Sequence, residues 1–456
     1  MPGNLSLDDL KTHTATGEID TVIACQIDMQ GRLMGKRFQA EFFVDSAWAE
    51  THSCNYLLAT DLEMATVDGY AATSWASGYG DYTMRPDLTT LRRVPWLDGT
   101  ALVLCDVLDH HGVLPVRHSP RAMLKHQVDR LANMGLTAMM GTELEFFTFR
   151  ESYEQIHDDD YRTLTPASPY NEDYHIFQTT REEPVMRAIR NGLHGAGVPV
   201  ESTKGEAEAG QGEINVRYSD ALDTADNHAI TKNACREIAW QNGHALTFMA
   251  KWHHDRVGSS GHLHQSLRHL DSGTAAFPDP DGMFGMSMTM RHFLAGQLLH
   301  SRALTYFLAP YINSYKRFAA GTFAPTAAIW STDNRTAGFR ICGTDTANVR
   351  IECRIGGADL NPYLAMAALI AAGIDGLKNE QELESPFTGD AYTDSGIREI
   401  PRTLRAATDA LNQSEMLRAA MGDDVIDHYV RAARWEQEEF DRVVTDYEVK
   451  RGLERA

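Results

Sequence analysis

Two glutamates, Glu143 and Glu145, interrupt a mostly apolar stretch, MMGTELEFFTF at residues 139–149. The stretch is typical of a buried strand, in which residues i and i+2 point to the same face. Two neighbouring carboxylates in an apolar setting are costly unless something compensates their charge. An exposed strand face or a buried salt bridge would explain them, but the flanking methionines and phenylalanines favour a divalent cation between the carboxylates.

A second acidic group lies in KGEAEAGQGEINVRY, residues 204–218. Glu206, Glu208 and Glu213 crowd a glycine-rich segment that continues into an expected strand. Glu208 is best explained as part of a solvated loop. Glu213 follows GQG and precedes INVRY, so it is expected at the start of the strand.

Two histidines, His262 and His264, occur at i and i+2 in GSSGHLHQSL, residues 258–267. The Gly/Ser loop before them would let a ligand approach the backbone closely. Two histidines alone are a weak indication of a metal site, but beside four candidate carboxylates they become a stronger one. Mixed oxygen and imidazole ligands favour Mg²⁺ or Mn²⁺ over structural zinc.

Arginines gather in NSYKRF, DNRTAGFR and VRIECRI, between residues 313 and 355. The set is Arg317, Arg335, Arg340, Arg350 and Arg354. Guanidinium groups bind carboxylates and phosphates through paired hydrogen bonds, although a network of salt bridges is an equal alternative for any single arginine. Glu352, in the alternating VRIECRI strand, is a further candidate metal ligand. Metal-binding carboxylates with anion-binding arginines suggest phosphoryl transfer, but no Walker-type or kinase motif is present.

The elements that must position these residues suggest two domains, which the length of 456 residues also favours. The first 110 or so residues are strand-rich, and TVIACQIDMQGRLMGKRF predicts a hairpin. A helix is expected over SPRAMLKHQVDRLANMG, capped by Ser119 and ended by a glycine. A second helix is expected after Asn361 as its cap and Pro362 at its first position. We therefore predict domains at 1–112 and 113–456.

Composition excludes several classes of function. The formal net charge of −21 argues against nucleic acid and anionic membranes as main partners. The six cysteines form no C-x-x-C pair, which favours free thiols in a reducing cytoplasm. No signal peptide and no apolar run long enough to cross a bilayer is evident. We predict a cytoplasmic enzyme without nucleic-acid or membrane partners.

Taken in order, the motifs resemble those of the glutamine synthetase superfamily. They are the E-L-E pair, KGE…GQGE, GHLHQSL, LAPYINSYKRF, NRTAGFRI and VRIECRIGGADLNPYLAMAALIAAG. The resemblance covers nearly the whole chain. It implies an α+β fold, with an N-terminal β-grasp domain before a catalytic domain built on a curved antiparallel sheet and surrounding helices. It also implies a homo-oligomer of two stacked rings, a dodecamer with active sites shared between subunits.

The resemblance also implies a role for each site residue in an ATP-dependent reaction that needs Mg²⁺ or Mn²⁺. One ion would be held by Glu145, Glu206 and Glu213, and the other by Glu143, His262 and Glu352. The glutamate substrate would contact Arg317, Arg354 and Gly258, and the transferred phosphate would contact Arg335 and Arg340. The nucleotide would lie against Tyr218, His264, Ser266 and Arg350.

The chain departs from the family pattern where an amine would bind. Family members carry a glutamate in a G-Y-E-A-P segment, whereas this chain has GTFAP with Phe323 at that position; Val257 also replaces an asparagine. An aromatic ring weakens a site for NH₄⁺ and suits an amine with an organic group. The pattern is most similar to γ-glutamyl–monoamine ligases, acting on ethanolamine, isopropylamine or anilines in amine assimilation or detoxification. Ammonia-dependent glutamine synthesis and a non-catalytic ring protein are the alternatives.

Overall fold

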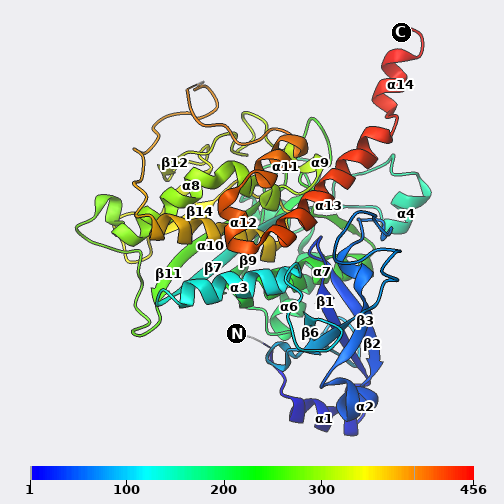
Figure 1. Cartoon of the computed structure of the whole chain (residues 1–456). Helices are drawn as coiled ribbons and strands as arrows, with labels where there is room; N and C mark the ends of the chain where they lie inside the picture. The colour runs from blue at the N-terminus through cyan, green and yellow to red at the C-terminus, as the bar shows by residue number, and fades with distance from the viewer. Residues whose placement is uncertain (1–2, 395) are drawn as a thin grey trace.

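The computed structural model describes residues 3–394 and 396–456 and contains two β-sheets (Figure 1). The first has six strands in the order β2-β1-β6-β4-β3, with β5 paired to β6. Its strands are β1 (Thr21–Ile27), β2 (Leu33–Gln39), β3 (Thr51–Cys54), β4 (Asp81–Pro86), β5 (Arg92–Arg93) and β6 (Thr100–Leu108). β1 and β2 pair antiparallel through the turn at Gly31, so the predicted hairpin is confirmed.

The second sheet has eight strands in the order β12-β13-β14-β11-β7-β9-β8, with β10 paired to β7. Its strands are β7 (Leu136–Phe149), β8 (Val200–Gly205), β9 (Gln211–Asp220), β10 (Ala245–Thr247), β11 (Gly261–His269), β12 (Trp330–Thr332), β13 (Phe339–Cys342) and β14 (Arg350–Cys353). All pairs are antiparallel except β12 with β13, which are parallel. The predicted α+β class is confirmed, and the antiparallel description holds for the sheet apart from this edge.

Helices cover the second sheet and form the C-terminal part of the chain. They are α3 (Pro120–Ala132), α4 (Tyr153–Asp158), α5 (Ile176–Thr179), α6 (Glu183–Gly195), α7 (Ala221–Gln241), α8 (Met288–Leu308), α9 (Ile312–Tyr315), α10 (Pro362–Lys378), α11 (Leu404–Asn412), α12 (Glu415–Met421), α13 (Asp423–Arg442) and α14 (Asp446–Gly452). Two further helices, α1 (Leu7–Ala15) and α2 (Ala40–Phe42), lie with the first sheet. Among the described residues, no helix has the length and apolar character that crossing a membrane requires.

The predicted helix starts are largely confirmed. Asn361 caps α10, because its side chain accepts a hydrogen bond from the Tyr363 backbone N–H, and Pro362 occupies the first turn. α3 also begins where expected, but Ser119 stands at its N-cap without making the capping hydrogen bond. The position of this helix start is therefore set by Pro120 and by packing rather than by the serine.

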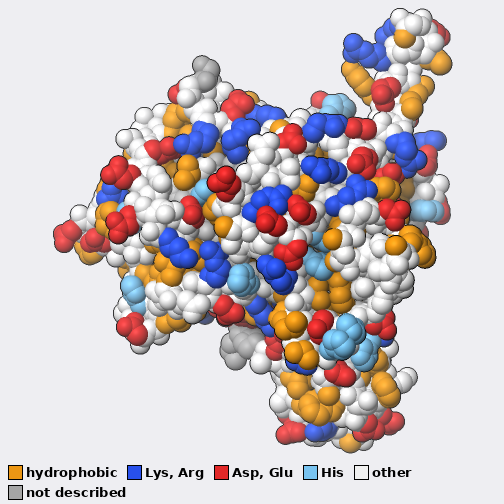
Figure 2. All heavy atoms as spheres, in the orientation of Figure 1, with side chains coloured by type: hydrophobic (Ala, Val, Ile, Leu, Met, Phe, Trp, Pro, Cys, Tyr) orange, Lys and Arg blue, Asp and Glu red, His pale blue; other side chains and the backbone are white. Residues whose placement is uncertain are grey.

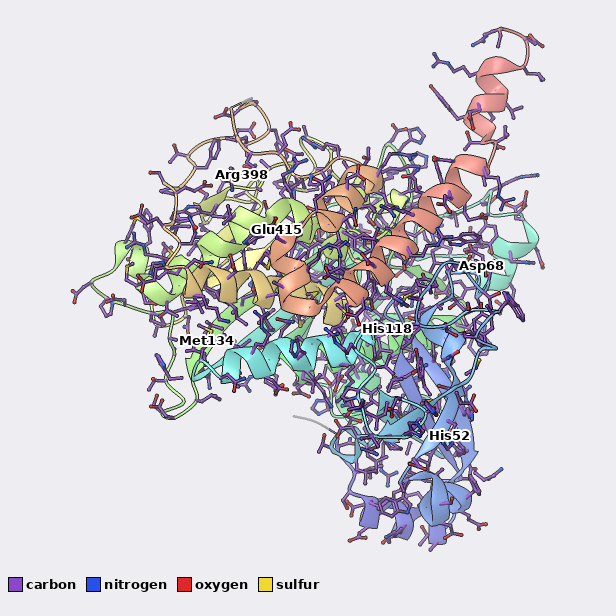
Figure 3. The ribbon with its side chains drawn as sticks, viewed as in Figure 1. His52, Asp68, His118, Met134, Arg398 and Glu415 are labelled. Atoms are coloured by element: carbon purple, nitrogen blue, oxygen red, sulfur yellow. The ribbon has the colours of Figure 1, made fainter. Side chains whose placement is uncertain are left out.

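One continuous core joins the two sheets. Ile27 and Leu104 of the first sheet belong to the same cluster as Leu144 of β7 and the buried residues of α7 and α10. His118, labelled in Figure 3, lies in the segment between the two sheets and contacts α13. Its ring stacks on the His428 ring of that helix, with the ring centroids 4.2 Å apart. The predicted domain boundary at 112/113 falls between the end of β6 and the start of α3, and it stays a prediction. All six cysteines are free, as predicted.

The last helix of the chain, α14, leads away from the body of the molecule. α14 projects alone at the end of α13 (Figure 1), and none of its residues is buried. Its arm carries exposed apolar side chains between charged ones (Figure 2), including Val444, Tyr447 and Leu453.

Candidate active site

Strand register in the second sheet brings the sequence-predicted acidic residues together. Glu143 of β7 lies directly opposite His262 of β11, and Glu145 lies opposite Glu213 of β9. Glu352 of β14 lies opposite His264 of β11. Side chains at directly opposed positions have Cβ atoms about 5 Å apart, which is close enough to share one ion. The alternation that predicted one face for Glu143 and Glu145 therefore extends over four neighbouring strands.

Glu145, Glu206 and Glu213 form the first carboxylate cluster. One oxygen of each lies within 4.8 Å of the others. The backbone N–H of Ser260 donates to Glu145 at 2.7 Å, and the Gln211 side chain donates to Glu145 at 3.2 Å. Both Glu145 and Glu213 are buried. This is the ligand set that the sequence predicted for one ion.

The first cluster carries more negative charge than its protein neighbours compensate. Burial and the charge of Glu206 raise the pKa of Glu145 to about 7. Burial, followed by the charges of Glu206 and the other nearby carboxylates, raises the pKa of Glu213 to about 8. Like charges held together in a desolvated site disfavour ionisation unless a cation is present. A set of three oxygen donors with this imbalance fits a hard divalent cation such as Mg²⁺ or Mn²⁺.

Glu143, Glu352 and two histidines form the second cluster. His262 Nδ1 lies 3.2 Å from Glu143 and 3.5 Å from Glu352. His264 Nε2 lies 2.8 Å from Glu143 Oε1. The predicted metal ligand His262 and the predicted nucleotide contact His264 thus both reach Glu143. The donor atoms that lie within 4.8 Å of one another belong to Glu143, His264 and Glu352, so His264 stands in this group where His262 was predicted. His262 Nε2 is buried with no hydrogen-bond partner among the described residues, whereas its Nδ1 faces both carboxylates.

The second cluster is compensated by the protein, in contrast with the first. Burial alone would raise the pKa of Glu143, but hydrogen bonds from His262 and His264 hold it well below its ordinary value. Burial is likewise outweighed at Glu352, where the charges of His262 and Arg354 lower the pKa to about 2. Burial, followed by the charge of Arg354, lowers the pKa of His262 to about 4, so it is neutral and able to bind a metal near neutral pH.

The arginines surround these clusters at different depths. Arg354 and Arg340 contact Glu352 at 2.5 and 2.9 Å through their guanidinium groups. Arg335 is exposed at the cavity surface. Arg317 is only 1% exposed, and its guanidinium donates to Ser260 Oγ and to two backbone carbonyls. Arg317 and Glu352 therefore lie in the wall behind the cavity, while the other predicted site residues line it.

The cavity has a volume of about 860 Å³ and is lined by residues of both acidic clusters. Tyr218, Ser266 and Arg350, which were predicted to contact a nucleotide, also line it, as does Phe277. Arg350 donates to His264 Nδ1 at 3.3 Å, and this bond fixes the ring with Nε2 toward Glu143. A cavity lined by carboxylates and by aromatic and basic side chains can hold a nucleotide whose phosphates approach the acidic clusters.

Phe323 also lines the cavity. Its side chain is 55% exposed, and its backbone has a positive φ of 57°, which is uncommon for a large residue. Its carbonyl accepts a hydrogen bond from Arg354 at 3.4 Å. Val257 and Gly258 are further lining residues. At the position where the family pattern has a glutamate, the cavity lining therefore carries an aromatic ring instead of a carboxylate.

Several cavity residues were missed by the sequence analysis. Gln211 lies inside the GQGE motif, yet its contact with Glu145 required the fold to be seen. Lys204 binds Glu206 and also lies 3.1 Å from Asp173, and Tyr174 lies beside it. The sequence pattern KGE contains Lys204, so this residue could have been considered. Asp173 and Tyr174 lie in the loop before α5, and no motif or periodicity in the sequence marks them as cavity residues.

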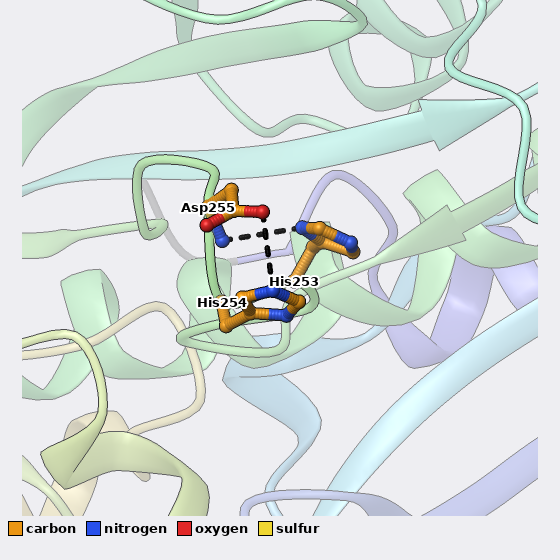
Figure 4. Close-up of side chains that lie close together, drawn as sticks. All are labelled: His253, His254 and Asp255. Carbon is orange, nitrogen blue, oxygen red and sulfur yellow. Dashed lines mark hydrogen bonds and ion pairs between the residues drawn. The ribbon is translucent and has the colours of Figure 1, made fainter.

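Outside the cavity, His253, His254 and Asp255 lie close together in one loop (Figure 4). His254 and Asp255 are exposed, and His253 Nδ1 accepts a hydrogen bond from the Asp255 backbone N–H at 3.2 Å. That bond uses the imidazole lone pair a metal would need. The cluster is therefore explained as a turn at the surface rather than as a third metal site.

Comparison with known proteins gives consistent results. The family model for the glutamine synthetase catalytic domain matches residues 117–452. A γ-glutamylethanolamide synthetase of Streptomyces coelicolor is 49% identical over 452 residues, which cover 99% of this chain and 96% of that protein. A glutamate–isopropylamine ligase of a Pseudomonas species is 35% identical, covering 96% and 95%. A solved GmaS/ADP complex superposes with a TM-score of 0.84 at 26% identity, covering 98% of this chain and 99% of that one.

Proposed function

Because the chain belongs to the glutamine synthetase family, we propose that it is an ATP-dependent ligase that joins the γ-carboxylate of L-glutamate to a small organic amine. The observation that carries the proposal is the combination of two clusters of potential metal ligands with Phe323 in the lining of the same cavity. Relatives named for ethanolamide and isopropylamine products support an organic amine over ammonia.

The two clusters would each hold one divalent cation, Mg²⁺ or Mn²⁺. Glu145, Glu206 and Glu213 offer one set, and Glu143, His262 and Glu352 offer the other. When bound, such ions neutralise the phosphate chain and the γ-carboxylate, which lowers the barrier to phosphoryl transfer. Protein groups that already point into the cavity need no reorganisation during the reaction.

The arginines would position glutamate and the transferred phosphoryl group. Arg335 and Arg340 are assigned to the phosphoryl group, and Arg354 to a glutamate carboxylate. Arg317 lies in the wall behind the cavity, where its hydrogen bonds to Ser260 and to the carbonyl of Arg354 would hold these two residues in position. The γ-carboxylate attacks the terminal phosphorus of ATP and ADP leaves, which gives γ-glutamyl phosphate.

The amine then attacks the γ-carbonyl carbon of γ-glutamyl phosphate. A C–N bond forms, the C–O bond to phosphate breaks, and one amine proton is lost, so the products are a γ-glutamyl amide and inorganic phosphate. Phe323 and Val257 offer apolar contact to the organic group of the amine. The physiological role that we assign is cytoplasmic amine assimilation or detoxification.

A homo-oligomer, a double-ring dodecamer, is part of the same proposal. The projecting segment of α14 supports it, since α14 has no buried residue and the apolar side chains of Tyr447 in the helix and Leu453 just after it are exposed. Such an arm gains stability only by packing on another surface. Size-exclusion chromatography with light scattering measures the assembly directly.

The test of the activity is phosphate release with glutamate, ATP and Mg²⁺ across a panel of amines. The panel contains ammonium, ethanolamine, isopropylamine, methylamine, aniline and putrescine, with mass spectrometry of the products. We expect one monoamine to dominate, with little response to ammonium. A dominant ammonium response would instead make the protein a glutamine synthetase, and no response to any amine would make it a non-catalytic relative.

A further inference from the structure

Two side chains of one loop, Asp173 and Tyr174, line the cavity without being held in place by burial. Both are exposed, and they belong to residues 168–175, which we call the cavity loop. Asp173 lies 3.1 Å from Lys204 Nζ, and the Asn171 side chain donates to the Ala207 carbonyl at 3.0 Å. Water competes for such contacts, because the loop side chains that make them are exposed. The position of the cavity loop therefore depends on a deeper anchor.

Glu172 is this anchor. It is 0% exposed, although its neighbours on both sides are exposed. Ser168 Oγ donates to its carboxyl group at 2.8 Å, and Ser168 in turn accepts a hydrogen bond from the Gly210 backbone N–H. Glu172 also packs closely on β8, since a Cβ added at Gly205 would lie 2.5 Å from its carbonyl oxygen and 2.8 Å from its Cγ. The centre of the cavity loop is thus attached to the sheet through one buried acidic residue.

The buried partner of Glu172 is a second carboxyl group, that of Glu182 immediately before α6. Glu182 is 8% exposed, and its carboxyl group lies within hydrogen-bonding reach of the Glu172 carboxyl group. Glu172 Oε2 and Glu182 Oε1 are buried and receive no hydrogen bond from an N–H or O–H group of the described residues. Two carboxylates at such a distance repel, whereas one proton between them forms a hydrogen bond.

The cations near this pair are bound elsewhere. Lys204 of β8 binds Glu206 and Asp173. Arg190 of α6 binds Glu183. Among the described residues, no lysine or arginine lowers the pKa of either carboxyl group of the pair. The other titratable or charged side chains on the surrounding elements are exposed, and they are Tyr170, Tyr174, His175, Arg181, Arg187 and Glu201.

The balance of charge makes the pair sensitive to pH. Burial raises the pKa of Glu172, and burial followed by the charge of Glu172 raises the pKa of Glu182 to about 8. In an opened loop both groups would meet water and titrate near the ordinary glutamate value of about 4.3. A group whose pKa is raised in the folded state contributes fully below the unfolded value, and this contribution is lost as the pH rises to the folded value. The pair therefore holds the loop about tenfold more weakly for each pH unit between about 5 and 8.

We propose that Glu172 and Glu182 are positioning residues that share one proton, and that this proton holds the cavity loop with Asp173 and Tyr174 against β8 and α6. Loss of the proton loosens the loop and with it this part of the cavity lining. A second cavity of about 510 Å³, which Glu182 and Gly205 line, lets the proton exchange with solvent. The hydrogen bond stands independently of the ligase proposal, whereas its effect on turnover rests on the proposed ligase function.

A contact that only fills space is the competing explanation, and such a contact would not depend on pH. Glu182→Gln replaces the shared proton by a permanent amide N–H donor, and Glu172→Gln does so from the other side. Glu183→Gln is the matched control, because Glu183 is the next residue but is paired with Arg190. The first carboxylate cluster is the same in all these proteins, so its own titration contributes equally to each.

The first readout is amide hydrogen exchange of residues 168–175, measured by mass spectrometry at pH 6.0 and 8.0 and corrected for the intrinsic effect of pH. We expect protection in the wild type and in Glu183→Gln to fall about tenfold or more between these pH values. In Glu182→Gln and Glu172→Gln we expect nearly constant protection. Constant protection in the wild type, or the same fall in the glutamine variants as in the wild type, would overturn the proposal. The wild-type result decides even where a variant does not fold.

The second readout is the pH profile of kcat/KM for the amine that the wild type uses best, between pH 6.0 and 8.5. The ratio of Glu182→Gln to wild type should rise with pH, while the ratio of Glu183→Gln to wild type stays constant. A constant ratio for Glu182→Gln would overturn the positioning role. If the wild type uses no amine at any pH, the ligase function fails, while hydrogen exchange still decides whether a shared proton holds the cavity loop.

Discussion

Replacing Glu213 by glutamine should stabilise the metal-free protein at alkaline pH while weakening its response to metal. Glu213 is buried in the first cluster, and Asn215 donates to its carboxylate at 2.9 Å. Glutamine has nearly the same shape and can accept the same hydrogen bond. The substitution therefore removes charge and leaves the packing almost unchanged.

The magnitude follows from the raised pKa. Burial and the neighbouring carboxylates raise the pKa of Glu213 from 4.5 to about 8. A group whose pKa is higher in the folded state loses its favourable contribution as pH rises through the folded value. At about 1.4 kcal/mol per pKa unit, ionising Glu213 in the metal-free fold costs on the order of 5 kcal/mol, and less if Glu145 takes up the proton instead.

The assay is urea denaturation in EDTA at pH 5.0 and pH 8.5. We expect Glu213→Gln to exceed the wild type by about 2–5 kcal/mol at pH 8.5 and to match it at pH 5.0. Glu208→Gln is the control, because Glu208 lies in the loop just before β9 but pairs with Arg256. Mn²⁺ should stabilise the wild type more than the variant. A difference that is independent of pH, or a variant less stable at pH 8.5, would refute an uncompensated first cluster.

Three further substitutions test other parts of the cavity. Glu352→Gln should abolish ATP turnover, because the buried carboxylate is both a proposed metal ligand and the ion-pair partner of two arginines. Size-exclusion chromatography should show that the assembly is intact, and a variant that stays active with metal bound would contradict this role. Phe323→Glu should shift preference toward ammonium in the amine panel, and an unchanged preference would place Phe323 outside the amine site. Gly258→Ala should raise the KM for glutamate about tenfold or more, because the new Cβ would lie 2.4 Å from the Ala250 carbonyl oxygen and 2.7 Å from Cγ of Arg317 and would displace this part of the cavity wall. Gly80→Ala, with open space around it, should leave this KM unchanged.

The acidic clusters could be predicted from the sequence because a strand has a simple period. Glu143 with Glu145, and His262 with His264, each occupy alternate positions, so their faces are fixed once the strands are recognised. The partners across strands were taken from the resemblance, and the register then placed Glu143 beside His262. Periodicity cannot say which histidine meets which carboxylate, and both in fact reach Glu143.

Strand periodicity could not predict how deeply a side chain is buried or which distant residue it contacts. Arg317 and Arg354 are equivalent as cationic residues in the sequence, but one forms hydrogen bonds behind the cavity wall and the other reaches Glu352. Lys204 meets Asp173 only because the loop before α5 folds over β8. The parallel pairing of β12 with β13 likewise depends on the path of the chain between two short strands. These features are set by tertiary packing, which leaves no period in the sequence.

The two acidic clusters differ in how the protein balances their negative charge, and this difference affects how strongly each would bind a cation. Protein cations surround Glu352, so a metal ion entering there must compete with Arg340 and Arg354. Glu213 has no comparable arginine contact among the described residues, so a cation entering the first cluster relieves repulsion instead. The first cluster would therefore gain more from a bound cation than the second. At the second cluster, a cation would take the place of Arg340 and Arg354 beside Glu352, and these arginines would then be available to the anions of the reaction.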